Sequence, residues 1–170
     1  FLFVANLISK DPQVIIEGNQ KVLSARLADA EFFYNFDKRT PLANFVKRMT
    51  NVVYHNKLGS QYERIERLQK IAHEIALRLQ IDAKKAERAA YLLKADLATE
   101  MVGEFPELQG IMGNYYALAS GESTEIANAI EQHYYPRFSG DELPNSALAT
   151  VMSLADKLES LVGIWGIGLI

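Results

Sequence analysis

The chain has 170 residues, of which 49% are hydrophobic and 23% charged, a composition typical of globular proteins. It contains no cysteine, which excludes disulfides and thiolate metal sites and is compatible with a reducing cytoplasm. The formal net charge of −3 gives no general support to nucleic-acid binding, and the glycine-rich apolar run at residues 161–170 is too short to span a bilayer.

The first eight residues, Phe1 to Ile8, are β-prone and predict a strand. No second convincing strand follows nearby to pair with it, so we expect this strand to be the edge of a preceding domain. Phe1 stands where a Met would begin a complete protein, which suggests that the chain is cut from a longer one.

From residue 11 onward the pattern is helical. Asp11-Pro12 is typical of a helix start, and apolar residues then recur at helical spacing as far as Phe36. Ser60 and Glu63 have the spacing of a capping box, which predicts a helix over about 61–80. Further helices are expected to begin at Pro41, Asp82, Pro106, Ser123 and Asn145. The predicted fold class is therefore mainly α.

Three short basic groups occur: Lys38-Arg39, Lys47-Arg48, and Lys84-Lys85 with Arg88. Each is either a solvated surface feature or a patch that binds phosphates. Lys84, Lys85 and Arg88 are candidates for RNA contact, because successive turns of a helix can present them together.

The histidines His55, His73 and His133 do not have the spacing that places two imidazoles on one helical face for a metal. His73 is expected on a helix flank and His133 at a helix end. No phosphate-binding glycine loop and no Gly-x-Ser-x-Gly motif occurs in the sequence.

Two aspartates lie in apolar surroundings: Asp96 within Leu92–Leu97, and Asp156 within Ser153–Leu158. A buried carboxylate is costly unless it is paired or coordinated. One interpretation is that each forms an ion pair or caps a helix. The other is that both bind a divalent metal between two helices, although transition-metal sites of this kind normally add imidazole.

Four long segments resemble the β subunit of the bacterial two-subunit glycyl-tRNA synthetase. They follow the family's order, span nearly the whole chain, and are Ser24–Phe33, Leu93–Gly113, Tyr135–Phe138 with Asp141–Pro144, and Leu154–Gly168. The resemblance implies a cytoplasmic α2β2 ligase that joins glycine to tRNA(Gly) with ATP and Mg. In that family the α subunit holds the adenylate-forming site and β supplies tRNA-binding domains. The chain would then be an internal, noncatalytic part of β, without a cofactor of its own and without contact with a membrane.

The middle of this β subunit resembles the HD superfamily, helical domains that often bind metal through His…His-Asp…Asp. Here the His-Asp position corresponds to Ala95-Asp96, the final Asp to Asp156, and the leading His falls near Arg64. The resemblance thus implies a degenerate site without metal ligands or catalytic residues, in which Lys94, Lys157 or Arg64 pairs with the aspartates. It also implies an N-terminal segment at residues 1–50 and an HD-like helical bundle at residues 51–170 that is truncated at its C-terminal end.

Two other functions remain open: a metal-dependent HD-type phosphohydrolase, and a scaffold without RNA contact. Ala95 in place of the histidine counts against the phosphohydrolase. The acidic balance does not separate RNA positioning from pure scaffolding, because a large RNA can be held by weak phosphate contacts spread over several domains.

Overall fold

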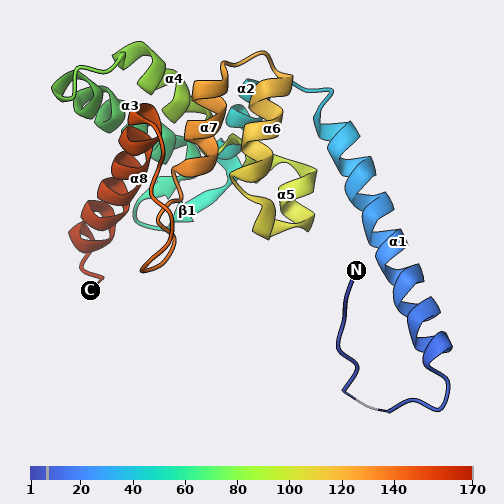
Figure 1. Cartoon of the computed structure of the whole chain (residues 1–170). Coiled ribbons are helices and arrows are strands. Elements are labelled where there is room, and N and C mark those ends of the chain that lie inside the picture. Colours follow the sequence, from blue (N-terminus) through green and yellow to red (C-terminus); the bar gives the residue numbers. More distant parts are fainter. Residues whose placement is uncertain (7, 170) are drawn as a thin grey trace.

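The computed structural model describes residues 1–6 and 8–169 and confirms the mainly α fold class (Figure 1). The α-helices are α1 (Pro12–Asp37), α2 (Leu42–Val46), α3 (Gln61–Arg78), α4 (Ala83–Leu92), α5 (Glu100–Glu104), α6 (Ile111–Ala119), α7 (Thr124–Gln132) and α8 (Ala147–Gly166). Short 3₁₀ helices connect them: η1 (Lys47–Asn51), η2 (Ala95–Ala98) and η3 (Pro106–Leu108). A small antiparallel hairpin joins β1 (Val53–His55) to β2 (Gly59–Ser60). Among the described residues, no helix is both long and apolar enough to cross a membrane.

Several helix starts form as the sequence predicts. The Asp11 carboxylate accepts a hydrogen bond from the Gln13 amide, and Pro12 opens α1. Ser60 and Glu63 form the full capping box at the start of α3, each side chain accepting from the other's backbone amide. The Asp82 carboxylate accepts from the amides of Lys84 and Lys85 in the first turn of α4.

Four local predictions are wrong. The helix expected to begin at Pro106 is only the 3₁₀ turn η3, and α6 begins at Ile111, because Gly110 has a positive φ that interrupts the helix. Residues 1–6 and 8 form no strand, while Leu7 lies outside the described residues; β propensity does not make a strand where no neighbouring strand takes up the backbone groups. The hairpin at β1 and β2 was not expected, because strands of three and two residues are too short to show an alternating pattern. The hydroxyl of Ser146, rather than Asn145, caps α8 by accepting from the Ala149 amide. The domain boundary at residue 50 stays a prediction.

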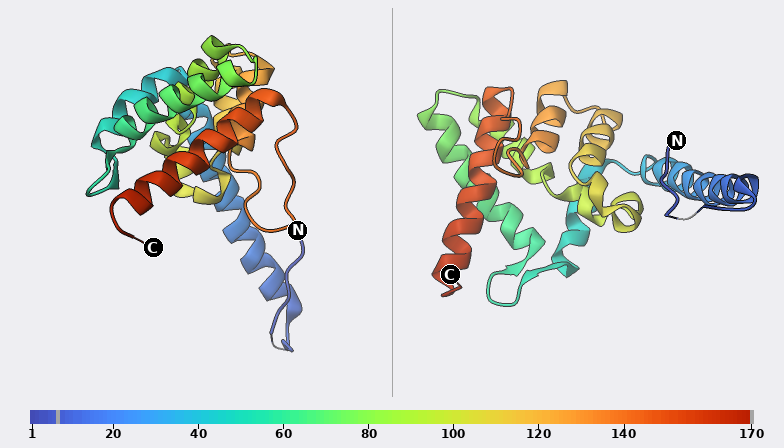
Figure 2. Two further views of the ribbon diagram at one scale, coloured as in Figure 1. Left: turned by 90° about the vertical axis from the view of Figure 1, so that its left-hand side faces the viewer. Right: turned by 60° about the horizontal axis from the view of Figure 1, so that its bottom comes forward.

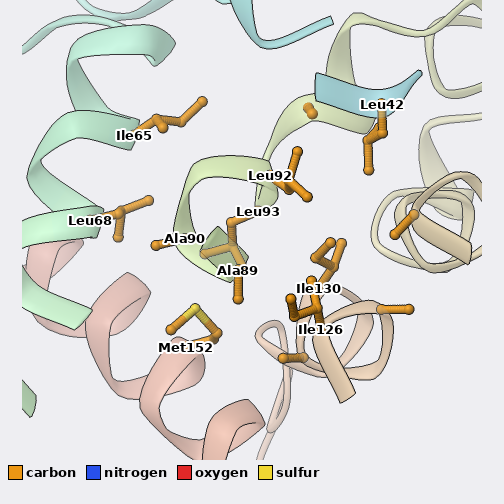
Figure 3. Packing of buried hydrophobic residues seen from close by; sticks show 14 of the residues in the cluster. Leu42, Ile65, Leu68, Ala89, Ala90, Leu92, Leu93, Ile126, Ile130 and Met152 are labelled. Carbon is orange, nitrogen blue, oxygen red and sulfur yellow. The ribbon is translucent and has the colours of Figure 1, made fainter. Parts of the chain in front are cut away.

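The core is organised around α4. Its buried face consists largely of alanines, Ala86, Ala89 and Ala90, which allow neighbouring helices to approach closely. Figure 3 shows Ala89, Ala90 and Leu92 between Ile65 of α3, Met152 of α8 and the isoleucines of α7. Contacts of α4 with α2, α3, α7 and α8 make it the central element of the bundle.

Helix α1 projects away from this bundle, as the views of Figures 1 and 2 show. It rests on α5, where the Arg26 guanidinium pairs with the Glu104 carboxylate and lies 4.2 Å from the Phe105 ring centroid. Its last residue, Asp37, is buried. The two carboxylate oxygens of Asp37 accept hydrogen bonds from the backbone amides of Glu100 (3.1 Å) and Met101 (2.9 Å) and from the Tyr116 hydroxyl (3.2 Å). Asp37 thus fixes the end of α1 to the starts of α5 and the middle of α6.

We expect Asp37→Ala to lower the free energy of unfolding by about 2–3 kcal/mol, because it leaves two buried donors and one part-buried donor without an acceptor. Asp29→Ala, which removes an exposed acid from the same helix, is the matched control and should change little. Urea unfolding of both variants measures the difference. Equal stabilities of the two variants would contradict a stabilising role for Asp37.

Candidate functional site

Lys94 is buried in the turn between α4 and η2, with only 3% of its surface exposed. Its ammonium nitrogen lies 2.7 Å from His133 Nε2 and 3.1 Å from Asp156 Oδ1. It also lies 4.3 Å from the centroid of the Tyr134 ring, within range of a cation–π interaction. Lys94 therefore contacts the end of α7 and the middle of α8 at once.

Arg64 of α3 approaches the same aspartate from the other side. Its guanidinium donates to Asp156 (3.0 Å), Glu159 (2.8 Å) and the Ser160 hydroxyl (2.7 Å). These three acceptors lie three and four residues apart, so α8 presents them on one face. Arg67 adds a second guanidinium to Glu159 at 2.8 Å. The result is a largely buried ionic cluster between α3 and α8.

Burial and charge act against each other in this cluster. Burial lowers the pKa of Lys94 to about 8, although the Asp156 carboxylate opposes the shift. Burial, aided by the Lys94 charge, lowers the pKa of His133 well below its ordinary value. For Asp156, burial would raise the pKa, but the positive charges around it, Lys94 foremost, outweigh burial and lower it. Asp156 is therefore a carboxylate and His133 a neutral imidazole at neutral pH.

The donor set around Asp156 does not fit a metal ion. The Lys94 ammonium contacts both the Asp156 oxygen and the His133 nitrogen that a metal would need. The other imidazole nitrogen, Nδ1, donates to the Ile130 carbonyl at 2.5 Å. Nowhere in residues 1–6 and 8–169 do three or more His, Asp or Glu side chains gather as a metal site would require.

The expected ion pairs at Asp156 are confirmed for Lys94 and Arg64. The third candidate, Lys157, instead donates to the Tyr135 carbonyl at 2.9 Å.

Asp96 has a different partner. It lies on η2, and its Oδ2 accepts a 2.6 Å hydrogen bond from the amide of Gly110, the residue that precedes α6. Gly110 has a φ of 81°, and a Cβ there would lie 2.8 Å from the Tyr134 ring. A Cβ at Gly113 would lie 3.0 Å from the same Asp96 oxygen and 2.6 Å from the Ile130 side chain. Two glycines thus let the start of α6 approach a carboxylate that its dipole favours.

The two aspartates of the sequence-predicted pair therefore have different hydrogen-bond partners. Ala95 packs in the apolar core, Asp96 binds the start of α6, and Lys94 is the residue of this turn that contacts Asp156. The physical reason is that α4 ends at Leu92 and a 3₁₀ turn follows, so these three neighbouring side chains point to different surroundings.

The three candidate RNA contacts lie exposed on α4, but two of them are already paired. Lys85 Nζ lies 2.8 Å from a Glu125 carboxylate oxygen, and the Arg88 guanidinium pairs with Glu122. Both acids belong to α7 or the turn before it, so these ion pairs join α4 to α7. This weakens the group as a phosphate-binding patch.

Comparison with known proteins assigns the chain to a protein family. The family described as "Glycyl-tRNA synthetase beta subunit" matches residues 1–170, the full length of the chain. The chain belongs to that family.

Named relatives agree with this beta-subunit assignment. The chain is 65% identical over its whole length to the glycine–tRNA ligase beta subunit of Neisseria meningitidis, and covers 25% of that protein. It is 59% identical over 169 residues to the beta subunit of Ralstonia nicotianae, covering 24% of it. The beta subunit of Aromatoleum aromaticum is 55% identical over 168 residues, 24% of its length. The chain thus spans about a quarter of the length of these beta subunits.

Sequence reasoning missed two members of the buried cluster of this beta-subunit chain. His133 lies at the end of α7 as expected, but the sequence did not show that its side chain is fully buried. Glu159 showed no signal of its own, although it lies one helical turn after Asp156 on the same face of α8. The available signal was the spacing of Asp156, Glu159 and Ser160, which predicts one polar stripe on an otherwise apolar helix.

We expect Asp156→Ala to lower the free energy of unfolding by about 3–5 kcal/mol, because it leaves the buried Lys94 ammonium without its carboxylate. Lys94→Met combined with Asp156→Ala should be more stable than Asp156→Ala alone, since the unpaired charge is then absent. Glu125→Ala, which breaks an exposed ion pair, is the control and should cost less than about 1 kcal/mol. If the double variant is no more stable than Asp156→Ala, the Asp156 carboxylate does not stabilise the buried charge of Lys94.

The stability of the folded chain should fall as pH decreases from about 7 to 5. In this range an unfolded His133 takes up a proton that the buried imidazole does not, because its folded pKa is lowered. His133→Gln should reduce this slope by up to about 1.4 kcal/mol per pH unit below pH 6. Urea unfolding at several pH values measures the difference between the two proteins, and parallel curves would show that folded His133 titrates normally.

Proposed function

We propose that this chain is a noncatalytic part of the β subunit of a glycine–tRNA ligase, and that it positions tRNA and connects neighbouring parts of the enzyme. The observation that carries the proposal is the family match over all 170 residues. The proposed enzyme is a cytoplasmic α2β2 ligase that attaches glycine to tRNA(Gly) with ATP and Mg, and whose adenylation site lies on the α subunit.

The buried cluster supports a noncatalytic role. A catalytic acid or base must reach a reacting atom. Lys94 and His133 are instead buried, and their polar atoms are engaged with one another, with Asp156 and with a backbone carbonyl. The same contacts argue against the alternative of a metal-dependent phosphohydrolase. The Lys94 ammonium occupies the position between the Asp156 oxygen and the His133 nitrogen that a metal ion would take.

Exposed apolar side chains support the connecting role. A large apolar surface on a soluble domain is commonly a contact surface. Here such side chains gather on the projecting helix and on the last turns of the C-terminal helix: Val14, Val22, Leu27 and Phe32 on α1, and Leu161, Val162 and Trp165 on α8. We therefore expect α1 and α8 to contact other parts of the subunit.

The proposal is tested in the complete two-subunit enzyme. Lys94→Met combined with Asp156→Ala should leave the rate of glycine-dependent ATP–pyrophosphate exchange unchanged, because the cluster takes no part in adenylation. The 170-residue chain alone should support neither this exchange nor phosphodiester hydrolysis with Mn²⁺ or Mg²⁺. Exchange by the chain alone, or a hydrolytic activity that Lys94→Met abolishes, would refute the noncatalytic role.

A further inference from the structure

The positive charges of the chain are unevenly distributed. Residues 38–62 contain five Lys or Arg and no Asp or Glu, although the whole chain has 21 acidic and 18 basic residues. The five cations are Lys38, Arg39, Lys47, Arg48 and Lys57, and all are exposed. We call these five residues the basic edge.

The cations of the basic edge differ in their pairing from four exposed cations elsewhere on the chain. Arg26, Lys85, Arg88 and Arg137 each form an ion pair with a nearby carboxylate. No carboxylate of the described residues lies within ion-pair distance of any of the five cations in the basic edge. The nearest acid in sequence, Asp37, is buried and engaged with backbone amides. In a chain with more acids than bases, this leaves a stretch of positive charge that no carboxylate of residues 1–6 and 8–169 neutralises.

The fold keeps these cations in solvent. In α2 and η1 the buried residues are Leu42, Phe45, Val46 and Met49, so Lys47 and Arg48 stay exposed beside them. The Arg48 guanidinium lies 4.7 Å from the centroid of the Phe45 ring, and the Lys38 ammonium 5.5 Å from that of Tyr34. Lys57 lies in the turn of the hairpin, between β1 and β2. In the right-hand view of Figure 2, the segment follows one edge of the bundle from the end of α1 to this hairpin.

We propose that the basic edge binds the phosphate backbone of RNA and is the place where this chain holds tRNA, in preference to Lys84, Lys85 and Arg88; this rests on the proposed function as part of a tRNA ligase. Lysine and arginine contacts with phosphates supply affinity without reading the base sequence. The basic edge therefore sets the position of the tRNA.

An acidic protein surface fits the basic edge less well than RNA. Protein interfaces deplete lysine and exclude unpaired charge from their centre. The basic edge instead places five positively charged side chains along 20 residues, from Lys38 to Lys57, with no acidic residue between them. A polyanion with regularly repeated phosphates can contact such a row at several points.

The test uses the complete β subunit assembled with its α subunit. One variant changes all five residues of the basic edge to Gln. The matched control changes five other exposed cations to Gln, none of which is paired with a carboxylate of the described residues: Lys10, Lys21, Lys70, Arg78 and Lys84. Affinity for tRNA is measured at several salt concentrations, together with glycine-dependent ATP–pyrophosphate exchange.

We expect the basic-edge variant to bind tRNA at least about 10-fold more weakly near 0.1 M salt, with the slope of log affinity against log salt reduced by about four. The control should bind as the unmodified enzyme does, and exchange should be unchanged in both. Equal affinity of the variant and the unmodified enzyme overturns the inference alone. Loss of subunit assembly in the variant overturns it in favour of a protein contact. An unmodified complex that neither binds tRNA nor adenylates glycine overturns the proposed function as well.

A second measurement needs no substitution. In the unmodified complex, bound tRNA should protect Lys38, Lys47 and Lys57 from an amine-acetylating reagent, as read by mass spectrometry of the peptides. Lys10, Lys21 and Lys70 should remain reactive. Protection of the second set without the first would overturn the assignment even if the five-residue variant failed to fold.

Discussion

Lys94 is buried between Asp156 of α8 and His133 at the end of α7, and the free energy of burying its charge constrains the whole bundle. An ammonium without its partners inside a protein costs several kcal/mol, so α4, α7 and α8 must keep the separations that satisfy it. Asp156 extends the constraint to α3, because the same carboxylate binds Arg64. Apolar contacts among alanines and leucines are non-directional and would tolerate other helix positions. The directional contacts of the ionic cluster favour one set of helix positions over the others.

The same arrangement determines what the site can do. A divalent metal between a carboxylate and an imidazole brings positive charge and also open positions for water or substrate. The Lys94 ammonium and the Arg64 guanidinium supply the charge to Asp156 but have no position for a further ligand. Their hydrogen bonds are directed at side chains of the protein itself. The cluster therefore supplies positive charge that holds these helices together, and its contacts leave no position for a further ligand at Asp156.

Local sequence signals predicted the elements whose ends are determined by neighbouring residues. The cap at Asp11, the capping box of Ser60 with Glu63 and the cap at Asp82 all form as expected, because each involves atoms within three residues. Two of the failures involved distant partners. A strand at the N-terminus needs another strand to pair with, and the contact of Lys94 with His133 joins residues 39 apart in sequence. The aspartates illustrate both cases: burial of Asp96 and Asp156 was predictable from their apolar neighbours, but which groups would satisfy them depended on how a 3₁₀ turn directs Lys94, Ala95 and Asp96.

Charge pairing gives the surface of the bundle two different electrostatic characters. Between α4 and α7, Lys85 and Arg88 are neutralised by Glu125 and Glu122, so this face presents little net field to an approaching polyanion. In the part of the chain that the structure describes, no carboxylate neutralises the basic edge, and with a net charge of −3 on the chain the remaining residues carry an excess of negative charge. At physiological ionic strength the screening length is about 8 Å, so a polyanion close to the surface experiences these regions separately. For the RNA contact proposed above, this contrast in charge would restrict an RNA to one side of the bundle without any base-specific contact.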